Sequence, residues 1–357
     1  MEGNRFIGID LGRKTYEACA ICQTGAIERW NGKTDGTGRE RLAQRLCSGN
    51  VVALEAGSTT FAVARALEAV AGVRTLVLNP RKLAIIYASM KKTDKEDALK
   101  LARLVETMRE EYLPIVPVPS EDEEEMRRLS GGQVFLKHER NRLINRLHAL
   151  FVGAGFTTIV KKGLARDASR RLMVERLSGV YGQLAMQLVG ILAEVEQQII
   201  ELNSAIRSAL GERREHAALL LSIPGVGPVT AAAFLGYVGD GSRFATASQV
   251  SYYIGMVPRI DNSGETSRLG HITKSGNATV RRAMVQAAWA AIRSRAGQPF
   301  REVFDRIAAR RGASIAIVAV ARRILELMYT LVINHEFYRH SSLSDRLQKL
   351  RRYKLSM

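Results

Sequence analysis

The chain has 357 residues, of which 46% are hydrophobic, and its 53 Lys and Arg against 35 Asp and Glu give a formal net charge of +18. This length suffices for two domains of ordinary size with buried cores. The positive excess favours nucleic acid as a partner, because Lys and Arg that neutralise phosphates release counterions. A basic protein without such a partner, or one that binds acidic lipid, is the alternative interpretation.

Neither a secretory signal nor a membrane span is expected. The apolar stretch that begins at Phe6 is broken by Asp10 and Arg13. Charged residues also interrupt the late apolar stretch 315–333, which indicates a buried helix. The three cysteines suggest a reducing compartment. We therefore expect a cytoplasmic, nucleoid-associated protein from a bacterium or archaeon with no membrane partner.

The N-terminal part alternates predicted strands and helices, which implies an α/β layer fold. The later strands are short and almost continuously apolar, as in parallel strands buried on both faces. A helix is expected to begin after Thr93. The predicted strands are residues 5–12, 15–22, 26–30, 51–54 and 75–79, and an earlier helix is predicted over 60–71.

The rest of the chain is predicted to be mainly helical. Three prolines followed by the acidic run 121–125 are typical of a linker, and long helices are predicted over 127–151 and 172–209. The basic tail from His340 is expected to pack loosely. The expected divisions are an α/β domain 1–110, a linker and long-helix region 111–212, a C-terminal domain 213–340 and a tail 341–357.

Four acidic residues in the N-terminal part lie on elements that could bring them together. Asp10 lies in the first strand, and Glu55 ends a later strand. Asp94 and Asp97 share one face of a helix for which Thr93 is a plausible N-cap. In a sheet of the ribonuclease H type these two strands are neighbours and the helix crosses their ends.

Converging carboxylates repel one another unless a cation lies between them. Mg²⁺ prefers oxygen ligands, and a pair of such ions can bind both the attacking and the leaving oxygen of a phosphodiester; Mn²⁺ can substitute. Lys91, Lys92 and Lys95 are then candidates for holding the nucleic-acid backbone. The alternatives are solvated charges at a helix start, for Asp94 and Asp97, and a strand end of the sugar-kinase type, for Asp10.

A glycine turn lies between two predicted helices further along the chain. Residues 221–232 read LSIPGVGPVTAA. Gly225 and Gly227 would let the backbone approach a phosphate, and the next helix would offer its N–H groups. The pattern is typical of a helix-hairpin-helix that binds the DNA backbone, and a tight turn between packed helices is the alternative.

The densest group of small, polar and basic residues is 252–282, YYIGMVPRIDNSGETSRLGHITKSGNATVRR. Ser263 before a glycine is a candidate nucleophile, although Ser267 and Ser275 stand close by. The alternative is a solvated basic face with ordinary turn chemistry. The basic candidates for phosphate contact are Arg268, His271, Lys274, Arg281 and Arg282.

The motif order GIDLG, LEAG, KTDKEDA, LSIPGVGPVTA, YIGMVPR and NSGETSRLGHITKSGNATVRR resembles the Piv/MooV transposases of the insertion-sequence one-hundred-ten group. The similarity covers residues 5–335. It implies a RuvC-like, ribonuclease H-like domain with an acidic DEDD set on Asp10, Glu55, Asp94 and Asp97, and a C-terminal transposase domain whose catalytic serine is Ser263.

The resemblance also implies partners and a mechanism. Family members act on double-stranded donor and target DNA, many under the guidance of a structured bridge RNA, and assemble as dimers or tetramers. Ser263 would attack a phosphodiester with help from the metal site, which could be built across subunits. A resolvase or another metal nuclease, a non-enzymatic nucleic-acid-binding protein and, more distantly, a sugar kinase-like ATPase are the rival interpretations.

Overall fold

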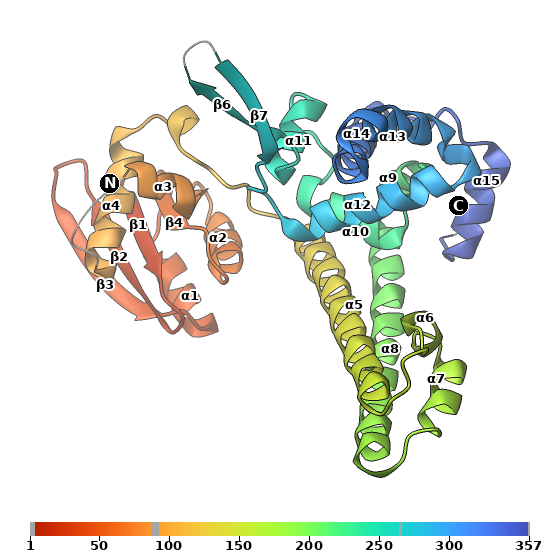
Figure 1. The fold of residues 1–357 in the computed structure, drawn as a ribbon. Coiled ribbons are helices and arrows are strands. Elements are labelled where there is room, and N and C mark those ends of the chain that lie inside the picture. Colours follow the sequence, from red (N-terminus) through yellow and green to blue (C-terminus); the bar gives the residue numbers. More distant parts are fainter. Residues whose placement is uncertain (1–3, 87–92, 264–265, 356–357) are drawn as a thin grey trace. The chain divides into compact units, whose positions relative to one another are not determined.

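The computed structural model describes residues 4–86, 93–263 and 266–355, and Figure 1 shows their secondary structure. The chain divides into two compact units, Met1–Pro119 and Ser120–Met357. The sequence predicted three regions after residue 110, namely 111–212, 213–340 and 341–357. Apart from residues 111–119, all three lie in the second unit. Those functional divisions stay predictions.

The first unit is built on a 5-stranded mixed sheet with the order β3-β2-β1-β4-β5. The first three strands are antiparallel to one another in turn, and β4 and β5 run parallel to β1. The predicted α/β class is confirmed. The strands are β1 (Phe6–Leu11), β2 (Thr15–Ile21), β3 (Ile27–Lys33), β4 (Val51–Glu55) and β5 (Arg74–Leu78); the helices are α1 (Gly36–Gln44), α2 (Thr60–Glu68), α3 (Pro80–Ile86) and α4 (Asp94–Thr107), with a 3₁₀ turn at Glu110–Tyr112.

Side-chain alternation along β1 and β4 divides the unit into two apolar layers. Ile7 and Leu54 belong to a buried cluster that includes residues of α1 and α2. Ala53 belongs to a separate cluster with Leu101 and Leu104 of α4. Successive strand residues point to opposite faces, so the sheet is covered by α1 and α2 on one face and by α4 on the other.

Helix α4 lies directly against the backbone of β1. A Cβ atom at Gly8 would lie 2.0 Å from the carbonyl oxygen of Ala98 and 2.4 Å from the amide nitrogen of Ala102. No side chain fits there, and the neighbouring atoms are helix backbone that cannot rotate away. Glycine at position 8 is therefore a condition for the close packing of α4 on the sheet.

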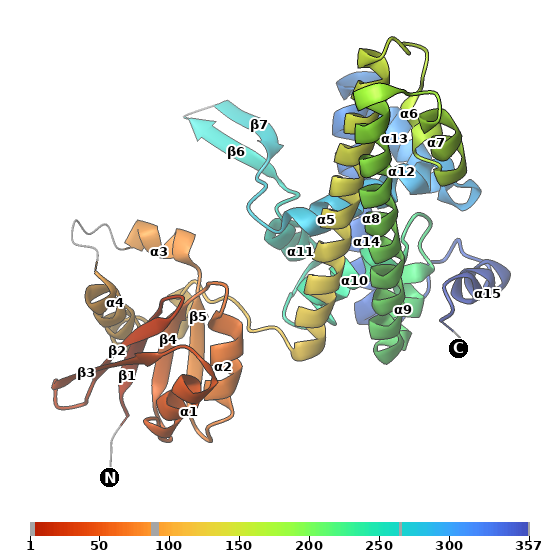
Figure 2. The same ribbon diagram turned by 90° about the horizontal axis from the view of Figure 1, so that it is seen from below.

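The second unit begins with two long helices, α5 (Glu121–Gly153) and α8 (Gly179–Glu212), which lie side by side in Figures 1 and 2. The short helices α6 (Lys161–Leu164) and α7 (Asp167–Val174) connect them. The predicted long helices are confirmed in outline, but the second begins at Gly179 rather than at residue 172.

The acidic run 121–125 is not a linker, as the sequence suggested, but the first turn of α5. The Ser120 side chain accepts from the backbone N–H of Glu123, and the Glu123 carboxylate accepts from the N–H of Ser120, which makes a capping box. Acidic side chains are favoured at this helix end because they complement the helix dipole. The same residues that looked like a polar linker are therefore a helix start.

A helical body completes the second unit, and a two-stranded hairpin is inserted in it. Its core gathers side chains such as Phe234, Met284, Ile324 and Met328. Among the described residues, no helix is long and apolar enough to span a membrane. The elements are α9 (Arg214–Leu221), α10 (Pro228–Val238), α11 (Ala247–Ile254), β6 (Pro258–Ser263), β7 (Thr266–Ile272), α12 (Ala278–Arg293), a 3₁₀ turn (Arg295–Gly297), α13 (Gln298–Arg311), α14 (Ala313–Asn334) and α15 (Leu343–Arg352).

The C-terminal tail packs on the helical body, contrary to the loose tail that its basic sequence suggested. Leu350 and Leu355 are buried in the main core of the unit. The Lys349 amine donates to the carbonyl oxygen of Ile223 at 2.7 Å. Burial, followed by the charge of Arg352, lowers the pKa of Lys349 to about 8. The tail is thus held by apolar burial and by the hydrogen bond of Lys349.

Replacing Gly8 with Ala should destabilise the first unit by about 2 kcal/mol or more, because overpacking costs about 1–3 kcal/mol even where side chains can yield. Gly36→Ala is the matched control, since a Cβ there would meet nothing within 4 Å. That control should be neutral or slightly stabilising. Denaturant unfolding followed by circular dichroism compares the two, and a Gly8→Ala protein as stable as the parent would contradict the role of this contact.

Candidate functional site

The carboxyl ends of β1 and β4 place Asp10 and Glu55 next to each other along the sheet. The two strands are parallel and adjacent, with Ile9 opposite Leu54, so the following residues are Asp10 and Glu55. Gly8 faces α4, and strand residues two apart share a face, so Asp10 faces the α4 side. Ala53 packs in the α4 cluster, which places Glu55 on that same side.

The start of α4 lies toward this end of the sheet. Phe6, at the beginning of β1, packs in the cluster that contains Leu104 and Met108 from the end of α4. The helix therefore runs against the direction of β1, and its first turn lies toward Asp10. That first turn carries Asp94 and Asp97.

Local hydrogen bonds fix this first turn. The Thr93 side chain accepts from the backbone N–H of Glu96, which is the N-cap that the sequence predicted. The Lys100 amine donates to the Asp97 carboxylate at 2.8 Å, one helical turn further along. Lys95 is exposed on the same turn, whereas Lys91 and Lys92 lie outside the described residues.

The donor set of this region consists of carboxylate oxygens, which suits a hard divalent cation. Within the described part of the chain, however, no group of three or more His, Cys, Asp or Glu side chains is arranged to hold a metal ion. The structure thus brings the predicted acids to one face and one end of the sheet, but the described side chains are not arranged around a common metal position.

The predicted nucleophile lies on a hairpin rather than in a loop between helices. Ser263 is the last residue of β6 and pairs with Thr266 of β7. Arg268 lies on β7 opposite Asp261. The side chains of these four residues are outside what the structure describes. Figure 1 shows the hairpin extending from the helical body beside α11.

The base of the hairpin is held by two glycines and an arginine. A Cβ at Gly255 would lie 2.6 Å from the amide nitrogen of Ser275, and one at Gly276 would lie 2.2 Å from the carbonyl oxygen of Tyr253. The Arg281 guanidinium donates to the carbonyl oxygens of Ile254 and Gly276, at 3.0 and 2.5 Å. These glycines approach another part of the chain, and Arg281 joins the two segments.

Comparisons with known proteins agree on one family. A family model for DEDD transposases of the IS110 type, described as "Transposase", matches residues 7–156, which include the acids on β1, β4 and α4. A second model, "Transposase IS116/IS110/IS902 family", matches residues 217–305, which include the hairpin.

The chain belongs to the IS116/IS110/IS902 family of transposases. Membership implies that it cuts and rejoins DNA. It is 25% identical to the transposase for insertion sequence element IS1111A of Coxiella burnetii, over 95% of this chain and 92% of that protein. It is 26% identical to the transposase for IS1328 of Yersinia enterocolitica, over 79% and 82%, and 26% identical to a probable family 20 transposase of Pseudomonas aeruginosa, over 70% and 75%.

The transposase contains the two helices and tight turn expected around residues 221–232, namely α9, the turn 222–227 and α10. Its glycines contact protein. A Cβ at Gly225, where φ is +82°, would lie 2.1 Å from the carbonyl oxygen of Ala287 in α12. At Gly227 a Cβ would lie 3.6 Å from the Tyr353 hydroxyl. Gly225 is thus needed for the packing of the turn on α12, so its presence is no evidence for a phosphate contact.

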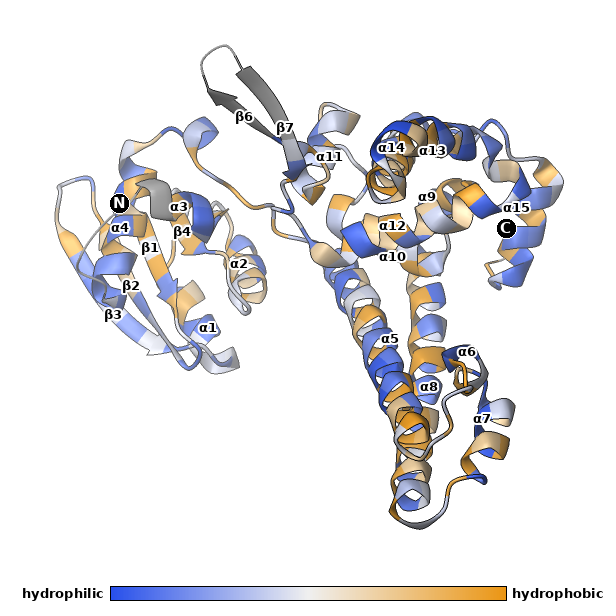
Figure 3. Cartoon of the chain, viewed as in Figure 1, coloured by the Kyte–Doolittle hydropathy of each residue, from blue (hydrophilic) through white to orange (hydrophobic). Residues whose placement is uncertain are grey.

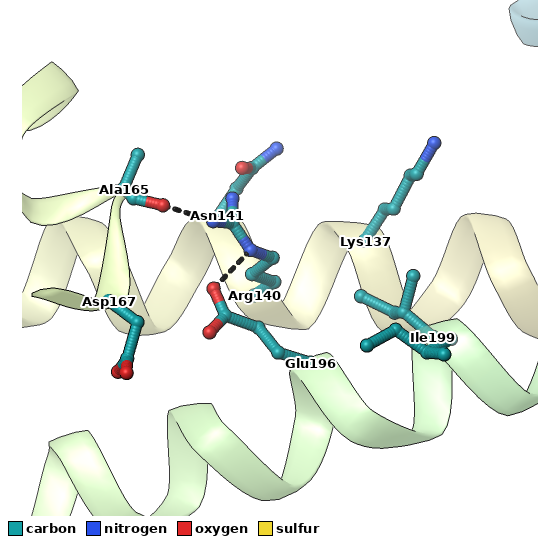
Figure 4. Close-up of a pocket in the computed structure, with 8 residues that line it drawn as sticks. Lys137, Arg140, Asn141, Ala165, Asp167, Glu196 and Ile199 are labelled. Carbon is teal, nitrogen blue, oxygen red and sulfur yellow. Dashed lines mark hydrogen bonds and ion pairs between the residues drawn. The ribbon is translucent and has the colours of Figure 1, made fainter.

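Two neighbouring pockets along α5 were not found from the sequence, which suggested only a long basic helix. One pocket, of about 490 Å³, lies where α5 and α8 meet the start of α7 (Figure 4). There Arg140 donates to Glu196 at 2.7 Å, and Arg170, fully buried, pairs with the same carboxylate at 2.7 Å and with Asp167 at 2.9 Å. The KHERNR block at 137–142 was the only available signal, and it shows as a hydrophilic stretch in the middle of α5 in Figure 3.

The two adjacent arginines at the start of α12 should differ sharply in their effect on folding. Arg281→Ala should lower the free energy of unfolding by about 2 kcal/mol, because it leaves two carbonyl oxygens without a charged donor. Arg282→Ala should change it by less than about 0.5 kcal/mol, as is usual for an exposed position. Thermal unfolding of both variants is the measurement, and equal shifts would contradict the assigned role of Arg281.

Proposed function

We propose that the chain recombines DNA as an insertion-sequence transposase, with a ribonuclease H-like first unit that carries the acidic site Asp10, Glu55, Asp94 and Asp97. The observation that carries this proposal is the register of β1 and β4, which sets Asp10 beside Glu55 on the face covered by α4. The strand order and the start of α4 at that end of the sheet support it. The family match supplies the DNA substrate.

The acids are suited to hold Mg²⁺, with one or two ions, and Mn²⁺ is an acceptable replacement because it also takes oxygen ligands. When bound, such a cation supplies charge stabilisation at the phosphoryl oxygens and at the leaving oxygen. The residues of the chain orient it: β1 and β4 fix two carboxylates, and the capped first turn of α4 presents the other two. Lys91, Lys92 and Lys95 hold the DNA backbone.

Ser263 is proposed as the nucleophile of the second unit. Its hydroxyl oxygen attacks the phosphorus of a DNA phosphodiester, a phosphoserine ester forms, and the 3′ oxygen leaves and takes up a proton. A serine hydroxyl is a weak nucleophile at neutral pH unless it is activated. Arg268, His271, Lys274 and Arg282 stabilise phosphate charge in this part of the reaction.

A structured guide RNA and self-assembly complete the proposal, and both rest on the family resemblance. The long helices are the proposed assembly element. Five large apolar side chains of α8 support this role, because they are 41–63% exposed and a contact between subunits would cover them. They are Val180, Leu184, Met186, Ile191 and Ile200. Contacts of this kind favour a homodimer or homotetramer.

Asp10→Asn should reduce recombination by at least about 100-fold while DNA binding persists, because a metal contributes several kcal/mol and about 1.4 kcal/mol is tenfold in rate. Glu106→Gln is the matched control, since it removes one exposed negative charge from the end of α4. Recombination between donor and target plasmids, with and without a chelator, is the measurement. Full activity of Asp10→Asn, or activity that survives chelation, would remove the acidic site from the mechanism.

Ser263→Ala should abolish a protein–DNA adduct that resists denaturation, whereas Ser267→Ala, on the same hairpin, should retain it. Gel analysis of denatured reactions with end-labelled DNA detects the adduct. If Ser263→Ala still forms it, the nucleophile lies elsewhere. If the parent protein cuts DNA without any adduct, the chemistry is hydrolysis by a resolvase-like nuclease.

A further inference from the structure

A pocket of about 670 Å³ lies where α5 meets the starts of α10 and α12. It lies entirely in the second unit, and its walls come from segments about 150 positions apart in the chain. Its lining residues are Gln133, Val134, Lys137, His138, Asn141, Val229, Thr230, Arg281, Arg282, Ala283, Val285 and Gln286.

The lining of this pocket is cationic and uncompensated. Lys137, Arg281 and Arg282 bring three fixed positive charges, and none of the described residues that line it is acidic. The adjoining pocket in Figure 4 is the reverse case, because its Arg140 is paired with Glu196 and its lining includes a second carboxylate, that of Asp167. Both pockets are lined by Lys137 and Asn141 of α5. Their difference in charge therefore comes from the other segments that line them.

Two of the three charges are available to a ligand. Arg282 is exposed, and in the described parts of the chain no carboxylate lies within ion-pair distance of it or of Lys137. In Figure 4 the Lys137 side chain extends away from Glu196. Burial, followed by the charge of Arg140, lowers the pKa of Lys137, and an anion beside this amine would favour its charged form.

The third charge and the start of a helix complete the wall. Arg281 reaches back to the carbonyl oxygens of Ile254 and Gly276 and so fixes the start of α12 to the hairpin base. Val229 and Thr230 belong to the first turn of α10, which has 11 residues. The N–H groups of a first turn have no acceptor within the helix and carry the positive end of its dipole, which favours anions.

We propose that this pocket binds a phosphodiester of a nucleic-acid strand, held by Lys137 and Arg282 and capped by the start of α10. The proposal rests on the proposed function, which supplies the nucleic acid. It adds a contact on α5 that the hairpin and the acidic site do not provide. Because Arg281 joins the pocket wall to the base of β6 and β7, a strand held here is anchored near the base of the hairpin whose far end carries Ser263.

The experiment compares salt dependence of binding for the full chain and for the double variant Lys137→Gln/Arg282→Gln. Fluorescence anisotropy is measured with a duplex DNA and with an RNA stem-loop of the same length. Each lost phosphate contact reduces the slope of log K against log salt by about 0.9 for duplex DNA and by about 0.7 where the RNA is single-stranded. We expect the double variant to lose about two contacts with one of the probes, and that probe identifies the source of the phosphate.

The matched control is Arg310→Gln/Arg311→Gln, which removes two exposed charges from the end of α13. It should keep the parental slope. An unchanged slope of the pocket variant with both probes, or an equal reduction in the control, would overturn the proposed site. Asp10→Asn should also keep the parental slope, because this test measures binding and not recombination. The pocket can therefore be tested even if the proposed chemistry of the acidic site is wrong. A parent protein that binds neither probe would overturn both proposals.

Discussion

The contact of α4 with the bare backbone at Gly8 is the constraint on which the first unit depends. Because the helix lies against Cα rather than against a side chain, its first turn is held close to the ends of β1 and β4. The positions of Asp94 and Asp97 relative to Asp10 follow from that approach. A methyl group at position 8 would move the helix, and with it the carboxylates, although position 8 itself has no functional atom to offer.

The same principle operates at the base of the hairpin. Gly255 and Gly276 let two backbone segments touch, and Arg281 satisfies the carbonyl oxygens that this contact leaves exposed. Glycines in a polar, basic segment first suggest a close approach to phosphate, yet these glycines approach other parts of the chain. A glycine therefore indicates that something comes near, and only the fold shows whether it is a ligand or the protein itself.

The sequence predicted best what depends on apolar periodicity. The five strands of the sheet and α4 with its Thr93 cap are present, because alternation and capping are local signals. The hairpin β6–β7 was missed, since PRIDNS and TSRLGHI show no apolar alternation. The acidic run 121–125 was misassigned because acids suit both linkers and helix starts. The common end of the sheet for the four acids could be predicted from the elements that carry them, whereas the pocket on α5 depends on contacts between distant segments, which one sequence cannot display.

The net charge of +18 is a sum over residues with different tasks. Arg170 and Arg140 are committed to internal carboxylates, and Arg281 to carbonyl oxygens. Glu196 matches the charge of Arg170 and Arg140 inside the protein. The carbonyl oxygens satisfy N–H groups of Arg281 but do not neutralise its charge. Arg282 and Lys137 have no such partner among the described residues, and a polyanion can gain their full attraction. Which basic residues bind nucleic acid is thus decided by what the fold leaves unmatched, and the count of Lys and Arg sets only an upper bound.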